Sequence, residues 1–291
     1  MFQPLNVLNR VNITILQQKI FCSRLIFLIM FLFFILGDSC CNPLSMGSIK
    51  KLIEKQISKV YVKSLEIGSN IEEDTLNGFF LNVNTQISMV CDMLAKDTKL
   101  QNGYNAIGFS QGGQFLRAVA QRCPSPPMVN LISVGGQQQG VYGFPRCPGD
   151  NVTLQTYKIK NGIYRLVQAE YWHDPLNEDE YRKKSVFLAD INQENTVNAT
   201  YRTNLLKVKN IALVKFLQDE MVEPRDSEVI KMYIDKNGKF NHLVSIITFQ
   251  DRLGLKEMNE AGRIFFLASP GDHLQFTEEW FIENIINKFL K

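Results

Sequence analysis

The chain has 291 residues, 45% of them apolar, and a formal net charge of +3. This length fits one large α/β domain or two small ones, with enough apolar residues for a sizeable core. The small charge and the single short basic run at 182–184 argue against a nucleic-acid-binding protein. The six cysteines form no CxxC pair and the three histidines have no zinc spacing, so we expect no structural metal site.

Disulfide bonds are the better explanation for the cysteines, and disulfides indicate an oxidising compartment. Three N-x-S/T sequons support this weakly, because so short a pattern often arises by chance. They begin at Asn12, Asn151 and Asn198.

The first distinctive segment is residues 25–36, a run of twelve apolar residues with Lys19 and Arg24 before it. Twelve residues are short for a membrane-spanning helix but suit the apolar core of a secretion signal. Gly37-Asp38-Ser39 and the pair Cys40-Cys41 follow directly. The residues alone leave three interpretations open: a signal, a membrane anchor, or the first core strand.

Strands and helices are expected to alternate along most of the remaining chain. The predicted strands are 59–67, 104–109, 129–136, 211–217 and 263–269. The predicted helices are 72–96, beginning near Asp74 or Thr75, then 111–123 and 276–290. Such alternation is typical of an α/β fold whose mostly parallel sheet is flanked by crossover helices. Residues 137–205 are less regular and are expected to form a cap-like insertion over the sheet.

The most specific motif is Gly108-Phe109-Ser110-Gln111-Gly112, which matches G-x-S-x-G between a predicted strand and a predicted helix. The glycines allow the tight turn that exposes the Ser110 hydroxyl at the carboxyl edge of the sheet. The backbone N–H of Gln111, at the start of the helix, is expected to donate to a developing oxyanion. Ser110 is therefore the candidate nucleophile.

A nucleophilic serine needs a histidine base and an acid that orients the base, in the chain order Ser, Asp or Glu, His. His273 lies in the loop after the last predicted strand, where this histidine belongs. We expect His173, in the cap-like segment, to be a hydrogen-bonded structural histidine, and His242 to lie in a turn-rich surface stretch.

For the acid, Asp219 follows the strand 211–217 and should project from the same edge as Ser110. Position alone leaves Glu220 and Glu223 as close competitors, with Asp226 further away. Asp272 adjoins the histidine, but adjacent side chains seldom reach the ring in the required geometry.

Several blocks of the sequence strongly resemble the palmitoyl-protein thioesterase family, over roughly residues 37–290. They are "GDSCCNPLSMG", "GYNAIGFSQGGQFLRAVAQRCPSPPMVNLISVGGQQQGVYGFPRCPG", "VQAEYWHDP", "FLADINQE", "QDRLGLKEMN" and "GDHLQFTEEWF". The resemblance implies an α/β-hydrolase fold and hydrolysis of the thioester between a fatty acyl chain and a protein cysteine. It implies a triad of Ser110, Asp219 and His273, with no cofactor.

The resemblance also implies partners and a location. The substrates would be S-palmitoylated proteins or peptides that carry a long-chain fatty acyl group. The protein would enter the secretory pathway, be glycosylated at Asn198 and reach the lysosome. Membrane anchoring would depend on residues 25–36.

The family's disulfides imply the pairs Cys40–Cys41 and Cys91–Cys123. A third bridge begins at the position of Cys147, but its partner is missing because this chain is several residues shorter there. Cys147 would be unpaired unless it reaches Cys22.

The largest departure from the family lies in the first strand. Where the family has a strand ending in His-Gly-Met-Gly-Asp-Ser-Cys-Cys, this chain has Phe34-Ile35-Leu36-Gly37-Asp38. Leu36 then stands at the position of the second oxyanion donor, a backbone N–H, and Ile35 replaces a glycine. We therefore divide the chain into an atypical N-terminal segment, 1–36, and a hydrolase domain, 37–291.

Two alternatives to an active thioesterase remain. One is a catalytically impaired splice form or paralogue that acts as a binding or inactive protein, prompted by the altered first strand and the missing cysteine. The other is a general lipase or esterase on the same fold, which the family blocks disfavour.

Overall fold

Six parallel strands lie at the centre of this computed structural model, which describes residues 12–18, 45–142, 170–230 and 251–291. The order across the sheet is β2-β1-β3-β4-β5-β6, and every neighbouring pair is parallel. The strands are β1 (Asn12–Gln18), β2 (Tyr61–Ser64), β3 (Tyr104–Ser110), β4 (Met128–Val134), β5 (Asn210–Phe216) and β6 (Ile264–Ser269). The predicted α/β class with a mostly parallel sheet is confirmed.

The five strands predicted downstream of the apolar run are all present, with ends shifted by a few residues. The helices are α2 (Met46–Gln56), α3 (Ile71–Phe80), α4 (Val83–Lys96), α5 (Gln111–Arg122), α7 (Glu178–Lys184), α8 (Leu188–Ile191), α9 (Ala199–Leu205), α10 (Leu255–Glu260) and α11 (Glu278–Phe281). A 3₁₀ helix, η3, spans Arg225–Val229, and α11 continues as the π-helix η4, Ile282–Leu290.

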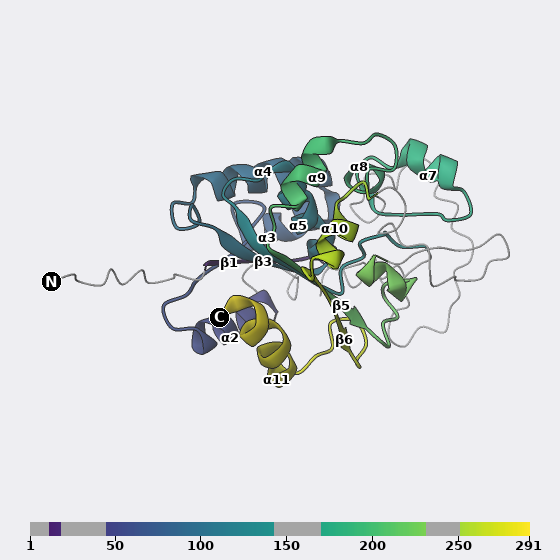
Figure 1. Cartoon of the computed structure of the whole chain (residues 1–291). Helices are drawn as coiled ribbons and strands as arrows, with labels where there is room; N and C mark the ends of the chain where they lie inside the picture. Colours follow the sequence, from purple (N-terminus) through teal and green to yellow (C-terminus); the bar gives the residue numbers. More distant parts are fainter. Residues whose placement is uncertain (1–11, 19–44, 143–169, 231–250) are drawn as a thin grey trace.

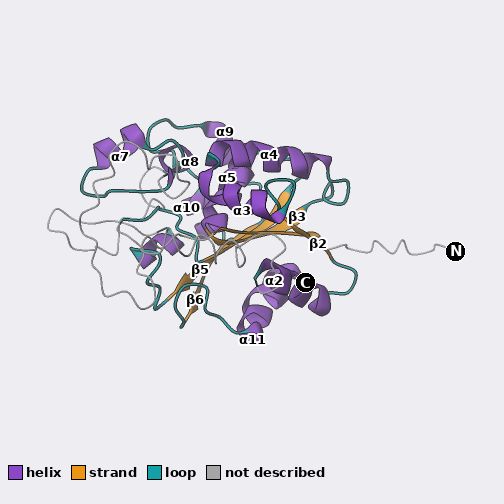
Figure 2. Ribbon diagram, turned by 180° about the vertical axis from the view of Figure 1, so that it is seen from behind, coloured by secondary structure: helices purple, strands orange, loops and turns teal. Residues whose placement is uncertain are grey.

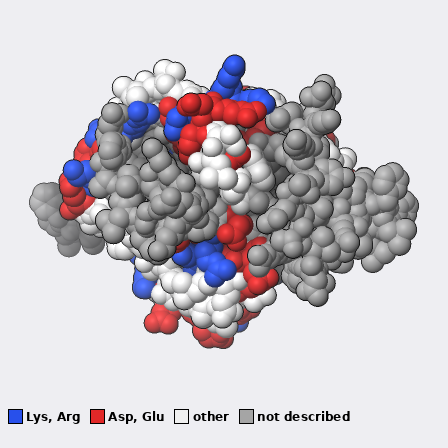
Figure 3. All heavy atoms as spheres, turned by 90° about the vertical axis from the view of Figure 1, so that its right-hand side faces the viewer, with Lys and Arg blue, Asp and Glu red and all other residues white. Residues whose placement is uncertain are grey.

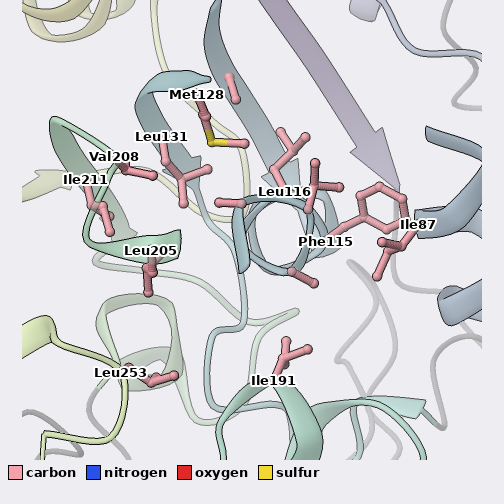
Figure 4. Packing of buried hydrophobic residues seen from close by; sticks show 14 of the residues in the cluster. Ile87, Phe115, Leu116, Met128, Leu131, Ile191, Leu205, Val208, Ile211 and Leu253 are labelled. Atoms are coloured by element: carbon pink, nitrogen blue, oxygen red, sulfur yellow. The ribbon is translucent and has the colours of Figure 1, made fainter. Parts of the chain in front are cut away.

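Helices cover both faces of the sheet, as Figures 1 and 2 show: α2 and α11 on one side, α3, α4, α5 and α9 on the other. The strands explain this, because successive side chains point to opposite faces. In β3, Ala106 faces the core shared with α4 and α5, whereas Ile107 and Phe109 face the core shared with α2 and η4. Figure 4 shows the first of these cores, where Phe115 and Leu116 of α5 meet side chains from the neighbouring elements.

The prediction of one helix over 72–96 was wrong, because two helices occupy this stretch. The first begins at Ile71, where the Asn70 side chain accepts from the N–H of Glu73 at 2.9 Å. The second begins after Asn82, whose Oδ1 accepts from the N–H of Asn84 at 3.0 Å. Asp74 lies in the first turn of α3, near the predicted start; it is buried and accepts from the N–H of Ile67 at 2.5 Å. The apolar spacing continues through the break, so the period alone could not reveal it.

The first strand of the sheet was not among the predicted strands. β1 is formed by Asn12–Gln18, between β2 and β3, with Gln18 in register with Ser110. β3 therefore has β1 and β4 as its two neighbours in the sheet. Residues 25–36 themselves, and Leu36 with them, lie outside the described residues.

The region predicted as a cap is described at 137–142 and 170–205. Its helix α9 packs against α5. The buried Arg117 of α5 donates to the carbonyl of Ile191 at 3.1 Å and to Asn192 Oδ1 at 2.7 Å, which ties α8 to the same helix. Residues 143–169 lie outside the description, so the division into domains and the cap role stay predictions.

The helices and the charged surface can each be compared with what a membrane or nucleic-acid partner would require. Within the described ranges, no helix has the length and apolarity needed to cross a bilayer. Figure 3 views the molecule from the right-hand side of Figure 1, and the acidic and basic side chains described there lie interspersed.

Candidate active site

Ser110 lies on a sharp turn between β3 and α5. It is the last residue of the strand and directly precedes the helix, with φ 52° and ψ −130°, a backbone conformation unusual for a non-glycine residue. A Cβ on Gly108 would lie 2.2 Å from the carbonyl oxygen of Gly112, and one on Gly113 would lie 2.1 Å from Ser133 Oγ. Only glycine therefore fits at position 108 of the motif and at position 113 just after it, and the strand–turn–helix context that the sequence predicted is present.

His273 reaches Ser110 from the loop after β6. Its Nε2 lies 3.0 Å from Ser110 Oγ, and its Nδ1 lies 2.5 Å from Asp219 Oδ2. Asp219 comes from the loop after β5, so all three side chains lie at the carboxyl ends of parallel strands of one sheet, β3, β5 and β6. The structure thus brings together the three residues that the sequence selected.

Asp219 is held as an anion in a buried position. Its side chain is fully buried, and burial alone would raise its pKa. The hydrogen bonds from His273 and Glu228 and the backbone N–H of Val222 outweigh burial and lower the pKa to about 2. Oδ1 accepts from the N–H groups of Met221 and Val222 at 2.7 Å each. Since Asp219 is ionised, His273 Nδ1 donates to it, which leaves Nε2 free to accept the proton of Ser110.

Two of the competing acids, Asp272 and Asp226, have other partners. Asp272 Oδ1 accepts from the N–H of His273 and from that of Glu220, at 2.7 and 2.9 Å, and so shapes the loop without reaching the ring. Asp226 pairs with Lys215. Asp219 is the carboxylate that hydrogen-bonds the imidazole.

The other histidines lie elsewhere. His173 is buried, with Nδ1 2.8 Å from the carbonyl of Gln139 and Nε2 3.0 Å from Glu178 Oε1, as expected for a structural histidine. His242 lies outside the described residues.

The side chain of Gln111 is fixed beside the turn. Its Oε1 accepts from Tyr171 Oη at 2.7 Å, and its Nε2 donates to the carbonyl of Gly78 at 3.4 Å. Its backbone directly follows the nucleophile at the start of α5, which is the position required of an oxyanion donor. The second predicted donor, Leu36, is outside the described residues.

Sequence reasoning missed one residue of this site, Glu228 of η3. It is fully buried, its Oε2 accepts from the N–H of Phe216 at 2.7 Å, and it lies beside Asp219. Burial, the hydrogen bond to Asp219 and the negative charge of Asp219 raise the pKa of Glu228 to about 11. Nothing in "PRDSEV" separates this glutamate from its acidic neighbours, because its environment is created by the folded chain.

Among the described residues, two side-chain groups have a composition that could hold a metal ion: His173 with Glu178 and Glu194, and Asp219 with Glu228 and His273. Neither needs an ion to satisfy its histidine, because both ring nitrogens of His173 and both of His273 already have hydrogen-bond partners.

A disulfide joins Cys91 of α4 to Cys123 at the end of α5, the pairing that the resemblance implied. Asn198 is exposed and caps α9, with its Oδ1 accepting from the N–H of Thr200 at 3.0 Å. The remaining cysteines (Cys22, Cys40, Cys41 and Cys147) lie outside the described residues.

The sequence profile of the family described as palmitoyl protein thioesterase matches residues 30–273. Palmitoyl-protein thioesterase 1 of Caenorhabditis elegans is 52% identical over 266 residues, which cover 87% of this chain and 89% of that protein. A lysosomal thioesterase PPT2 homologue of Drosophila melanogaster is 27% identical over 212 residues, covering 69% and 73%. Among solved structures, a monoacylglycerol lipase of Paleococcus ferrophilus is 10% identical with a TM-score of 0.45, covering 95% and 92%. On the profile and the nematode relative, the chain belongs to the palmitoyl protein thioesterase family and is a hydrolase with that family's α/β fold.

Proposed function

We propose that this protein hydrolyses the thioester bond of S-palmitoylated proteins through an acyl-enzyme on Ser110. One observation carries the proposal: His273 lies 3.0 Å from Ser110 Oγ and 2.5 Å from the Asp219 carboxylate at the same time. The family supplies the substrate class, and the two hydrogen bonds supply the chemistry.

The first half-reaction follows from the positions of the protons. His273 Nε2 takes the proton of Ser110 as Oγ attacks the thioester carbonyl carbon. Asp219 stabilises the imidazolium that forms. The backbone N–H of Gln111 donates to the developing oxyanion, helped by the N-terminus of α5. The carbon–sulfur bond breaks, the cysteine sulfur leaves and takes the proton from His273, which is then neutral again, and the fatty acyl group remains on Ser110.

The second half-reaction repeats these steps with water. His273 removes a proton from a water molecule that attacks the acyl-enzyme, and then returns the proton to Ser110 Oγ as the fatty acid is released. A thiol is a good leaving group, so oxyanion stabilisation and positioning matter more here than protonation of the leaving group. The acyl chain needs an apolar groove, worth about 0.8 kcal/mol per buried CH₂; we assign that groove to residues 137–205, part of which lies outside the described residues.

We further propose a lysosomal location reached through the secretory pathway. The support is that the Drosophila relative is named a lysosomal thioesterase and that an exposed sequon asparagine and a disulfide suit an oxidising compartment. Anchoring through residues 25–36 remains a separate hypothesis, which N-terminal sequencing of secreted protein tests.

The alternative of a catalytically impaired form is favoured by one observation. The strand beside the nucleophile is Asn12–Gln18, and residues 19–36 separate it from Gly37 along the chain. If this arrangement leaves the active site without its second oxyanion donor, the rate of hydrolysis would fall roughly 10²–10³-fold.

One experiment separates these hypotheses. The full chain and its Ser110→Ala variant are assayed for release of palmitate from a palmitoyl-cysteine peptide, and for hydrolysis of an oxygen ester of the same acid. The proposal predicts thioester hydrolysis that Ser110→Ala abolishes. Equal residual rates would support the impaired form, and faster ester than thioester hydrolysis would support a general esterase.

A further inference from the structure

Asp219 has a second buried acid as its neighbour. One oxygen of Asp219, one oxygen of Glu228 and one ring nitrogen of His273 lie within 4.8 Å of one another. Both carboxyl side chains are fully buried, so no solvent separates them. Two such groups cannot both carry a negative charge at this distance without a large electrostatic cost.

The hydrogen bonds show which of the two is charged. Asp219 accepts from two backbone N–H groups and from His273, all of which favour an anion. Glu228 Oε2 accepts from one N–H, whereas no described donor reaches Glu228 Oε1. A buried oxygen without a donor is costly unless it is itself protonated and donates. The arrangement is satisfied when Glu228 Oε1 carries a proton directed at the Asp219 carboxylate.

The chain holds Glu228 in this position from several sides. Phe216, whose N–H it binds, is the last residue of β5 and lies three residues before Asp219. The neighbouring Ser227 donates to the carbonyl of Gly140 at 2.6 Å and accepts from the N–H of Gln139 at 3.0 Å, which ties η3 to the loop after β4. Lys215, Asp219 and His273 are the charged or titratable groups that act on Glu228.

We propose that Glu228 is a positioning residue of the active site: as a neutral carboxylic acid it donates a hydrogen bond to Asp219 and fixes the carboxylate orientation that faces His273. Glu228 does not touch the substrate. It acts on Asp219, which in turn holds the imidazole in the tautomer that accepts the proton of Ser110. This inference rests on the triad of the proposed function and adds a fourth residue to it.

Two variants of similar size test the role of the proton. Glu228→Gln keeps both contacts, because its amide N–H donates to Asp219 and its carbonyl accepts from Phe216; kcat should stay within about threefold of the wild type. Glu228→Met removes both contacts. Its kcat should fall on the order of 10–100-fold, the rate equivalent of a lost hydrogen bond to a charged group, with KM nearly unchanged.

A third measurement reports the charge of Glu228 itself. If the residue is neutral, Glu228→Gln leaves the acid limb of the pH dependence of kcat/KM where it is. If the residue were ionised, removing its charge beside His273 would move that limb to lower pH. Glu194→Met serves as the matched control, because it also removes a largely buried carboxyl, one that accepts from Asn192 at 3.1 Å, outside the triad. It should lower the melting temperature and leave kcat per folded molecule within about twofold.

Three outcomes would overturn the inference: wild-type kcat in Glu228→Met, equal losses in both Glu228 variants, or an acid limb displaced in Glu228→Gln. An infrared difference spectrum of wild type minus Glu228→Gln adds a test that needs no turnover, since a neutral carboxylic acid has a carbonyl band that a carboxylate lacks. Absence of that band at neutral pH would contradict the inference even in a protein that hydrolyses no thioester. Failure of the proposed function and failure of this inference are therefore distinguishable.

Discussion

His273 Nδ1 lies 2.5 Å from Asp219 Oδ2, although 54 residues separate the two along the chain. The contact forms because β5 and β6 are adjacent parallel strands, so the loops that follow them leave the sheet side by side. It gives the imidazole one fixed orientation and directs its other nitrogen at Ser110. The consequences of breaking this contact can be measured.

Asp219→Asn is expected to lower kcat roughly 10³–10⁴-fold on a palmitoyl thioester. The amide can donate to Nδ1, which favours the tautomer with the proton on Nε2, and that tautomer cannot accept from Ser110. Asp226→Asn is the matched control, since Asp226 lies in the same loop region but pairs with Lys215. It should retain kcat within about twofold, and near-normal turnover by Asp219→Asn would exclude Asp219 as the orienting acid.

Gly108→Ala should damage both folding and activity. Its Cβ would lie 2.2 Å from the Gly112 carbonyl oxygen, a backbone atom that cannot turn away as a side chain can. Relief requires a backbone shift in the turn that carries Ser110, at a typical cost of about 1–3 kcal/mol for overpacking. Gly262→Ala is the comparison, because its Cβ meets no atom within 4 Å and only its φ of +69° is unfavourable. It should lower the melting temperature slightly and leave turnover per folded molecule unchanged, whereas Gly108→Ala should lower both.

Removing the Cys91–Cys123 disulfide is expected to cost about 2–4 kcal/mol of unfolding free energy. The bridge closes a loop whose ends are 32 residues apart, and its loss frees that loop in the unfolded chain. The double variant Cys91→Ala/Cys123→Ala, unfolded in urea, gives the value. The wild type with dithiothreitol should lose stability to a similar extent, and an unchanged midpoint in both would show that the bridge does not contribute.

The sequence predicted the parts of the site that depend on short-range chemistry. Ser110 was identifiable because a Cβ on Gly108 would clash with the backbone of Gly112, so the motif reflects the local geometry of the turn. His273 and Asp219 were identifiable because each follows a strongly apolar strand, and parallel strands bring their carboxyl ends to one edge.

The features that the sequence did not predict depend on contacts between residues far apart in the chain, or on side-chain caps that apolar spacing does not reveal. Glu228 is one of several acids in its loop, and its proton exists only because the folded chain buries it against Asp219. The strand Asn12–Gln18 was not predicted, because its sequence, NITILQQ, is short and mixes apolar with polar residues. The break before α4 is made by the Asn82 side chain, which apolar periodicity does not register.

Glu228 should also make stability fall as the pH rises. Its pKa is about 11 in the folded protein against an ordinary 4.5, so above about pH 4.5 the unfolded chain loses a proton that the folded protein keeps. The contribution of Glu228 to the unfolding free energy is therefore fully present below pH 4.5. It declines as the pH increases, by at most about 1.4 kcal/mol per pH unit. Glu228→Gln has no proton to lose in either state.

The measurement is the unfolding free energy of wild type and Glu228→Gln in urea at pH 5, 6, 7 and 8. The difference between the two should shift steadily in favour of the variant as the pH rises. A constant difference across this range would mean that Glu228 is ionised in the folded protein.

His173 provides a second pH dependence, remote from the triad. Burial alone would lower its pKa, but the hydrogen bond to Glu178 and the charges of Glu194 and Glu178 outweigh burial and raise it above the ordinary 6.5. The geometry agrees, since both ring nitrogens face oxygen acceptors and the ring stacks on Tyr181 with centroids 3.8 Å apart. The doubly protonated ring is therefore the form that the folded protein favours.

A raised histidine pKa contributes stability that is complete below pH 6.5 and is lost as the pH rises through the folded value. We expect the wild type to lose more unfolding free energy between pH 6 and pH 8 than His173→Gln, which keeps a hydrogen-bonding side chain but does not titrate. Glu178→Gln should reduce the same pH dependence by removing the partner of Nε2. Urea titrations at pH 5.5, 6.5, 7.5 and 8.5 provide the comparison, and the His173 ring resonances followed by NMR over the same range locate its titration directly. Parallel pH profiles of unfolding free energy for wild type and His173→Gln, or a His173 titration midpoint below pH 6.5, would contradict this prediction. Either result would show that burial lowers the pKa of His173 more than the two glutamates raise it, so that the fold does not stabilise the protonated imidazolium.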